Sequence, residues 1–170
     1  MAHVLTLSRK SAAAEARAGA AARALIADVN YGPLANWVGF HLRMAQIAAT
    51  CAFARASGEV DLPPGRFALL TLIGRNPGIS QTVLSRAAGR DKSTLTPALR
   101  DLKRRGLIVR ARLKRDRRSY ELQLTAAGAE MLQRLTACAE RHERALDRVI
   151  GRRERARFLA ALRRVTAELR

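Results

Sequence analysis

Apolar positions along most of the chain repeat at the spacing of α-helices. Residues 34–57 are apolar on nearly every side, and a helix of that kind is buried, often in a subunit interface. A long helix is expected at 126–150, and a last helix at 152–170 has an arginine-rich face opposite one apolar stripe. That stripe consists of Phe158, Leu162, Val165 and Leu169. The pattern therefore predicts a mainly α-helical protein.

Shorter helices are expected in the middle of the chain, where prolines, glycines and capping residues interrupt the pattern. A helix begins at "DLPPG" (61–65), because proline is tolerated at the first helical positions, and "NPG" (76–78) ends it. Two more helices are expected at 81–88 and 92–105. Side chains able to cap the helices that follow them are Ser80, Asp91 and Thr125.

Two segments with strand character follow, at 107–112 and 120–124. The residues between them are strongly basic, with Asp116 as the one acid, so a β-hairpin with a basic tip is predicted. A helix, a short helix, a turn, a further helix and a hairpin form a winged helix-turn-helix in outline. The predicted fold class is therefore mainly α, a winged helix-turn-helix with a helical dimerisation region.

This order of elements divides the chain into four expected parts. Residues 1–30 form an alanine-rich N-terminal arm or an extra helix. Residues 31–60 and 126–170 are the expected dimerisation helices, and residues 61–125 are the expected winged helix-turn-helix DNA-binding domain.

The helix at 92–105 has the pattern of a reading helix. Its leucines fall on one side and are expected to face the core, whereas the other side and its flanks carry hydroxyl groups first and arginines further on. The leucines are Leu95, Leu99 and Leu102, and the outward residues are Ser93, Thr94, Thr96, Pro97, Arg100 and Arg104. Hydroxyls can meet phosphates or base edges, and arginine can pair with guanine, so this helix suits a major groove. The alternative is a solvated helix face.

Pro97 lies inside this predicted helix. It removes one helix hydrogen bond, and a bend there or a helix start near Ser93 would relieve that cost.

The charge balance narrows the choice of partners. Lys and Arg number 32 against 14 Asp and Glu, which leaves a formal charge of +18. Such an excess repels itself and indicates a polyanionic partner, with nucleic acid as the first candidate and an anionic membrane surface as the second. A genome rich in G and C can explain arginine in place of lysine, but it does not explain so few acids.

The hairpin tip carries the densest positive charge of the chain. Its basic residues are Arg112, Lys114, Arg115, Arg117 and Arg118. A tip of this kind can lie along the minor groove, where the negative potential attracts an inserted arginine. Asp116 is expected to orient one of these arginines through a bidentate pair, and its alternative role is that of a turn-forming residue.

Other classes of protein find little support. Cys51 and Cys138 are far apart and lie in no Cys/His cluster, so neither a disulfide framework nor a metal site is expected. No apolar run approaches the roughly 20 residues of a membrane span, and no signal peptide is recognisable. We find no Ser/His/Asp set, paired carboxylates or phosphate-binding glycine loop. The expectation is a cytoplasmic protein that is not an enzyme and has no cofactor.

Several motifs together resemble the MarR-type transcriptional regulators. "DRRSYELQLT" matches their signature D-x-R-x-x-x-x-x-L-T, with Asp116, Arg118, Leu124 and Thr125 in the defining positions. "KSTLTPALRDLKRRGLIVR" is similar to the recognition helix and first wing strand of that family, and the resemblance covers about 34–150. It implies a homodimer that binds double-stranded DNA at a pseudo-palindromic operator, as a sequence-specific regulator and in most cases a repressor.

The resemblance also implies which residues contact DNA. Ser93, Thr94, Thr96 and Arg100 would enter the major groove, and Arg118 with its neighbour Arg117 would enter the minor groove. The expected set of contacts is completed by Lys92, Arg115 and Asp116. Whether Arg117 or Arg118 enters the groove is open.

Many members of that family release DNA when a small aromatic acid or related metabolite binds. Trp37, His41 and Met44 share a stripe of the first helix, with Arg43 beside them. A lone cation on a buried helix needs a partner, which is either an acid of the protein or the carboxylate of such a ligand. Simple packing is the alternative for these four residues. Cys51 and Cys138 are expected to be buried small apolar residues rather than oxidant sensors.

A second hypothesis for the whole chain is an architectural DNA-binding protein that is held by charge and has no small-molecule ligand. The two hypotheses differ in specificity, because a regulator prefers its own site by a factor on the order of 10³ or more over random DNA.

Overall fold

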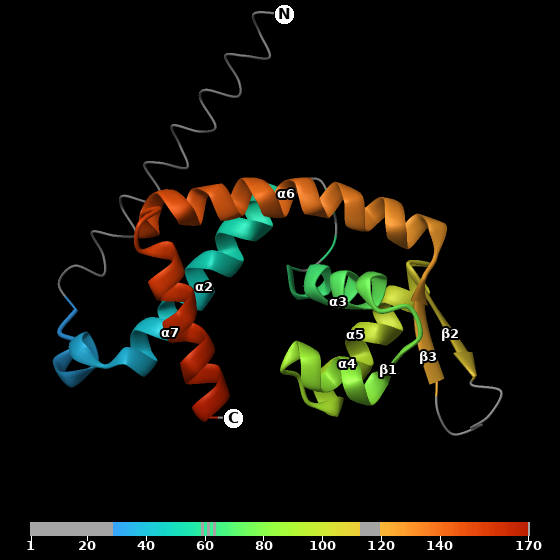
Figure 1. Ribbon diagram of the computed structural model, residues 1–170, viewed down its shortest axis with the longest axis horizontal. Coiled ribbons are helices and arrows are strands. Elements are labelled where there is room, and N and C mark those ends of the chain that lie inside the picture. The colour runs from blue at the N-terminus through green and yellow to red at the C-terminus, as the bar shows by residue number, and fades with distance from the viewer. Residues whose placement is uncertain (1–28, 59, 61, 63, 113–119, 170) are drawn as a thin grey trace, which may run out of the picture. The chain divides into compact units, whose positions relative to one another are not determined.

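The computed structural model describes residues 29–58, 60, 62, 64–112 and 120–169 (Figure 1). The predicted N-terminal arm, up to residue 28, and the hairpin tip at 113–119 lie outside the described residues. The chain divides into two compact units, Met1–Ala45 and Gln46–Arg170, with the boundary inside a helix. In chain order the elements are η1 (Gly32–Asn36), α2 (Val38–Ser57), α3 (Pro64–Arg75), β1 (Ile79–Ser80), α4 (Gln81–Ala88), α5 (Lys92–Arg104), β2 (Ile108–Arg112), β3 (Tyr120–Leu124), α6 (Ala126–Ile150) and α7 (Arg155–Glu168).

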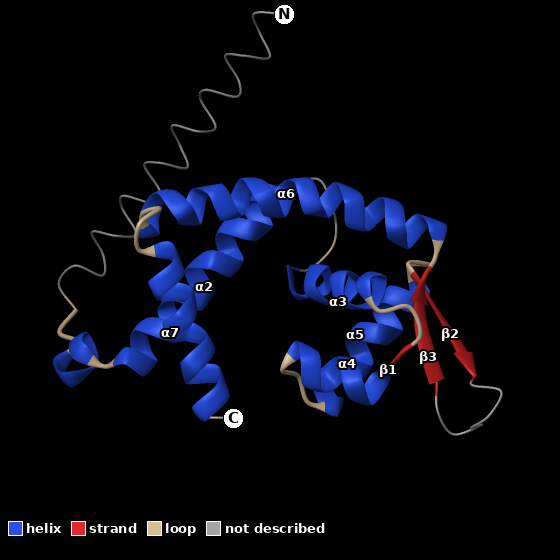
Figure 2. Ribbon diagram, viewed as in Figure 1, coloured by secondary structure: helices blue, strands red, loops and turns tan. Residues whose placement is uncertain are grey.

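The predicted fold class, mainly helical with a small sheet beside a helix-turn-helix, is confirmed (Figure 2). The start of the first long helix differs from the prediction. The helix expected over 34–57 is interrupted at Trp37, which is extended at φ −88° and ψ 120°, so η1 is a separate short 3₁₀ helix before α2. Within the first unit, the rings of Tyr31 and Phe40 lie 5.6 Å apart between centroids.

The core lies among α3, α4, α5, α6 and the sheet. The buried face of α5 consists of Leu95, Ala98, Leu99 and Leu102, so the predicted leucine stripe is confirmed. These side chains pack with residues of the other elements, among them Leu69, Leu70, Ile73, Leu84, Leu122 and Leu135, which are all almost fully buried. The packing fixes the rotation of α5 about its own axis, and with it the side of the helix that faces solvent.

Each predicted cap is confirmed by a hydrogen bond from a backbone N–H group. The Ser80 hydroxyl accepts from Val83 at 3.3 Å, the Asp91 carboxylate from Thr94 at 2.7 Å, and the Thr125 hydroxyl from Gly128 at 2.9 Å. At the turn between α4 and α5, Gly89 is left-handed at φ 62° and ψ 33°, a conformation that glycine adopts without steric cost.

The described strands form a three-stranded antiparallel sheet in the order β1-β3-β2. Its outer strands both pair with β3, through pairs such as Ile79 with Leu122 and Ile108 with Leu124. The sequence pattern predicted β2 and β3 but not β1, because a strand of two residues is too short to show alternation. β1 directly precedes α4, so it joins the helix-turn-helix to the wing.

A close contact between α6 and the turn after α5 sets the position of the wing. The Thr125 hydroxyl donates to the Gly106 carbonyl at 2.6 Å, and the Thr125 N–H donates to the Leu107 carbonyl at 3.1 Å. The same Leu107 carbonyl lies where a side chain at Gly128 would be, so the first turn of α6 can approach this closely only with glycine there.

Two of the helices expected at a subunit interface, α2 and α7, are largely exposed in the single chain, whereas α6 contributes Leu135 to the core. Every residue of α7 is at least partly exposed, and its expected stripe includes Phe158 at 42% and Leu169 at 83% exposure. The buried residues of α2 are Phe53 and Ser57, so the expectation that this helix is buried is wrong for one chain alone. The expectation for Cys51 is wrong in the same sense, since it is exposed, whereas Cys138 is buried as predicted.

Candidate nucleic-acid interface

Helix α5 presents a continuous polar face to solvent. Lys92, a predicted DNA contact, is exposed, and so are the residues predicted to lie outward, which are Ser93, Thr94, Thr96, Pro97, Arg100 and Arg104. The helix begins at Lys92 and is capped by Asp91, so the suggestion of a later start near Ser93 is wrong. Pro97 lies within this helix, and because it has no N–H group the Ser93 carbonyl lacks its usual helical partner. Both Ser93 and Pro97 are exposed, so water can hydrate that carbonyl.

Asp91 organises the N-terminal end of this face. One of its oxygens, Oδ1, accepts hydrogen bonds from the Ser93 hydroxyl at 2.7 Å, the Thr94 N–H at 2.7 Å and the Thr94 hydroxyl at 3.0 Å. The Ser93 hydroxyl bond, followed by the two bonds from Thr94, lowers the pKa of Asp91 to about 2. Asp91 is ionised at neutral pH and accepts from the Ser93 hydroxyl, while the Thr94 hydroxyl lies within hydrogen-bond distance of both this carboxylate and the Asp91 carbonyl oxygen, at 3.2 Å.

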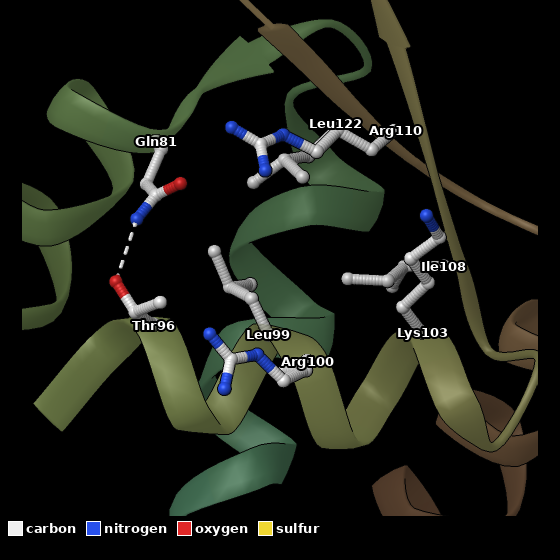
Figure 3. Close-up of a pocket in the computed structure, with 8 residues that line it drawn as sticks. All are labelled: Gln81, Thr96, Leu99, Arg100, Lys103, Ile108, Arg110 and Leu122. Atoms are coloured by element: carbon white, nitrogen blue, oxygen red, sulfur yellow. Dashed lines mark hydrogen bonds between the residues drawn. The ribbon is translucent and has the colours of Figure 1, made fainter.

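Thr96 has a different partner. Its hydroxyl oxygen accepts a hydrogen bond from the Gln81 side-chain amide at 3.1 Å, so Thr96 is tied to the first residue of α4 (Figure 3). The hydroxyl groups of this face thus fall into two kinds. Those of Ser93 and Thr94 are donors to Asp91, and that of Thr96 is an acceptor from Gln81.

A pocket of about 230 Å³ lies between α5, the start of α4 and the sheet (Figure 3). Leucine and isoleucine side chains give it apolar surface, and three cationic side chains are among its lining. The lining residues are Gln81, Thr96, Leu99, Arg100, Lys103, Ile108, Arg110 and Leu122. Positive charge therefore extends from α5 to strand β2, beyond the residues that the sequence analysis selected.

Gln81, Lys103 and Arg110 are the members of this lining that sequence reasoning missed as site residues. Gln81 directly follows the Ser80 cap, so its position at the start of a helix could be predicted from the sequence. Its proximity to Thr96, fifteen positions later, depends on how α4 and α5 pack. Lys103 is three residues after Arg100 on the same helix, so the helical repeat predicts that the two are neighbours. Arg110 is on β2, and its proximity to Arg100 depends on how α5 packs against the sheet.

Asp101 ties the reading helix to α3. Its Oδ2 atom lies 3.4 Å from Arg66 Nε, and its Oδ1 atom accepts from Arg104 Nη2 at 2.6 Å and from Arg105 Nε at 3.2 Å. Burial raises the pKa of this carboxyl, but the hydrogen bond and charge of Arg105, with Arg66 and Arg104, outweigh burial and leave the pKa below its ordinary value. One acid thus pairs with three arginines, of which Arg104 is on the exposed face of α5 and Arg66 is on α3.

The remaining predicted contacts fall on the hairpin tip. Arg115, Asp116, Arg117 and Arg118 lie outside the described residues, so the choice between Arg117 and Arg118 stays a prediction. The strands that carry this tip are described, and β2 pairs with β3 from Ile108 to Arg112.

The residues proposed for a ligand lie in the first unit. Trp37 and Met44 are 59% and 43% exposed, and the His41 ring nitrogen Nε2 lies 2.7 Å from the Ala35 carbonyl oxygen. Trp37 precedes α2 instead of belonging to it, so the expected helical stripe begins only at His41. Arg43 is exposed, and the argument that burial of this cation demands a partner is therefore wrong for the single chain.

The fold and the polar face of α5 define a winged helix-turn-helix DNA-binding protein. Residues 62–120 match the MarR family. The chain is also 34% identical over 148 residues to a protein of Thauera aromatica that is assigned as the transcriptional regulatory protein for the hcr operon. That match covers 86% of this chain and 89% of the relative. The chain belongs to the MarR family of transcriptional regulators.

Solved structures of two other proteins extend the comparison. The transcriptional repressor CouR, bound to a 23-mer DNA duplex, is 33% identical with a TM-score of 0.76, covering 82% of this chain and 99% of CouR. CouR has also been solved with p-coumaroyl-CoA bound. The PcaV transcriptional regulator from Streptomyces coelicolor, in complex with its natural ligand, is 27% identical with a TM-score of 0.76 and covers 84% of this chain and all (100%) of PcaV. In the part of the chain that is described here, no helix is long and apolar enough to cross a membrane.

The Asp101 cluster gives a stability prediction. Asp101→Asn removes the charge that Arg66, Arg104 and Arg105 share, so we expect a loss on the order of 1 kcal/mol in the free energy of unfolding at pH 7. Because the folded-state pKa of Asp101 is lowered, its contribution is present above the unfolded-state pKa and is lost as the pH falls through the folded value. The difference between wild type and variant should therefore shrink from pH 7 to pH 3 in urea unfolding. Glu130→Gln, at an exposed position of α6, is the control, and an equal Asp101→Asn deficit at both pH values would contradict the prediction.

Proposed function

We propose that this protein is a repressor that binds a pseudo-palindromic operator as a homodimer and releases it when a small aromatic acid, or a thioester of one, binds. The observation that carries the proposal is the two-sided character of α5. Its leucine face is held in the core, while Thr96 and Arg100 on its other side are exposed and line the same pocket as Arg110 of the wing. The DNA-bound state of CouR, a relative with 33% identity, supports this use of the fold.

The same proposal assigns DNA binding and dimerisation to different parts of the chain. Residues 61–125 bind DNA, and residues 31–60 and 126–170 join two copies. Exposed apolar side chains on both α2 and α7 support the second part, because association that covers them removes apolar surface from water. They include Val38, Ile47, Phe158 and Val165. Two linked reading helices would then meet two half-sites about one turn of DNA apart.

Operator binding is tested with the DNA that flanks the gene encoding this protein. At physiological salt we expect wild type to prefer its own site over random duplex by a factor on the order of 10³ or more. Arg100→Ala, and Arg118→Ala on the wing, should each weaken specific binding by roughly 1–3 kcal/mol without unfolding the protein. Fluorescence anisotropy and mobility shift measure both quantities, and Arg163→Ala removes the same charge from α7 as the control. Binding without preference among sequences would favour a charge-driven architectural protein instead.

Self-association is tested on α7. Phe158→Glu places a charge on the exposed apolar stripe, and we expect it to shift the protein from dimer to monomer at micromolar concentration in sedimentation equilibrium. Ala160→Glu introduces the same charge two positions away, on the opposite side of the helix, and should leave the dimer intact. A wild type that sediments as a monomer, or equal behaviour of the two variants, would contradict the assignment of α7 to the interface.

A ligand is tested through Trp37, the single tryptophan of the chain. CouR bound to p-coumaroyl-CoA and PcaV bound to its natural ligand support a ligand-responsive regulator. Titration with a panel of aromatic acids and their coenzyme A thioesters should give a saturable change in Trp37 fluorescence and release of DNA with at least one of them. Arg43→Ala should weaken that response more than Arg55→Ala on the same helix. No response to any member of the panel would remove the proposed ligand class.

A further inference from the structure

Gln81 occupies a position from which it can contact the same DNA as the reading helix. It is the first residue of α4, where the Ser80 cap fixes the backbone, and its side chain is half-buried. Its amide nitrogen Nε2 donates to Thr96 Oγ1 at 3.1 Å, and both residues line the pocket that also contains Arg100 (Figure 3). A side chain from the helix before α5 thus lies within the polar face of α5.

The hydrogen bonds on this face show which side chains still have a donor or acceptor available for a ligand. The hydroxyls of Ser93 and Thr94 donate to the ionised Asp91. Thr96 accepts from Gln81 and so keeps its own hydroxyl proton. Gln81 uses one N–H in that bond and keeps the other N–H together with the oxygen Oε1. Within the described residues, Gln81 therefore offers a donor and an acceptor side by side at the end of a restrained side chain.

We infer that Gln81 is a specificity-determining residue of the operator complex, that it reads an adenine, and that Thr96 positions it. A glutamine amide matches adenine in the major groove, because its oxygen accepts from N6 and its N–H donates to N7. This pairing requires that the plane of the Gln81 amide is fixed. The hydrogen bond to Thr96 already restricts the rotamers of Gln81 in the free protein, so less conformational entropy is lost when DNA binds. Arg100, one turn after Thr96, is placed to read a nearby guanine. The inference rests on the operator binding proposed above.

The test is selection of binding sites from a pool of random duplexes by the full-length protein. Wild type should select a motif with an A·T pair that it discriminates from other pairs by roughly 5- to 100-fold at one position of each half-site. Gln81→Ala should lose that preference and keep the rest of the motif. Thr96→Val should weaken the preference at the same position, and the double variant should be no worse there than Gln81→Ala alone, because the two residues act as one unit.

Gln81→Glu separates base reading from a structural role. A carboxylate cannot donate to adenine N7 but can accept from cytosine N4, so the selected base at that position should change from adenine to cytosine. Gln133→Ala, at an exposed glutamine of α6, is the matched control and should leave the motif unchanged. Thermal unfolding of each variant establishes that it is folded.

The outcomes distinguish this inference from the proposal on which it rests. If wild type selects no motif, operator binding itself fails and the inference falls with it. If wild type selects a motif and Gln81→Ala weakens all sequences equally, Gln81 contacts phosphate, and the inference is overturned while operator binding stands. An unchanged motif and affinity in Gln81→Ala, or a Gln81→Glu variant that still selects adenine, overturns it as well.

Discussion

The burial of one side of α5 is the constraint on which the rest of this structure depends. Leu95, Ala98, Leu99 and Leu102 are held in a core made by α3, α4, α6 and β3, and helix rotation would expose them. Burying side chains of this size contributes roughly 1.5–3 kcal/mol each for the leucines, which is large against the net stability of a domain. The polar side of the helix is therefore presented in one orientation. The contact of Thr125 with Gly106 and Leu107 then holds the wing at a set position relative to that helix.

Two acids of this strongly basic chain, Asp91 and Asp101, organise hydroxyl groups and cations on α5. Asp91 caps α5 and holds the hydroxyl protons of Ser93 and Thr94, while Asp101 holds three arginines and joins α5 to α3. Neither acid neutralises Arg100 or Lys103, so the excess charge remains on the face that the proposed function directs to DNA. Repulsion within that surface is a cost to the free protein that a polyanion removes, and DNA affinity of this kind falls steeply with salt.

Much of the fold could be predicted because its determinants are local. Ser80, Asp91 and Thr125 cap the helices that follow them through bonds spanning three residues, and such bonds can be read from spacing alone. The leucine stripe of α5 follows from a repeat of 3.6 residues, and β3 follows from alternation. β1 was not predicted because a strand of two residues is too short to show an alternating pattern. The prediction that Cys51 is buried was wrong because an apolar helix is buried only where a second surface covers it. Trp37 interrupts the first helix beside Asn36, Val38 and Gly39, which are all poor helix formers, so local propensity favoured a break that the apolar pattern did not show.

The sequence by itself determined the class of protein, its helix order, the outward face of the reading helix and the excess of positive charge. These depend on residue type and on spacing within one segment. Only the tertiary structure decided which hydroxyls of that face keep a proton for a partner. For Thr96 that choice depends on a contact between segments, since Ser93 and Thr94 bond to Asp91 in their own turn of the chain whereas Thr96 meets Gln81 from another helix. The packing of α4 against α5, which brings the two residues within 3.1 Å, is not contained in the pattern of either helix alone.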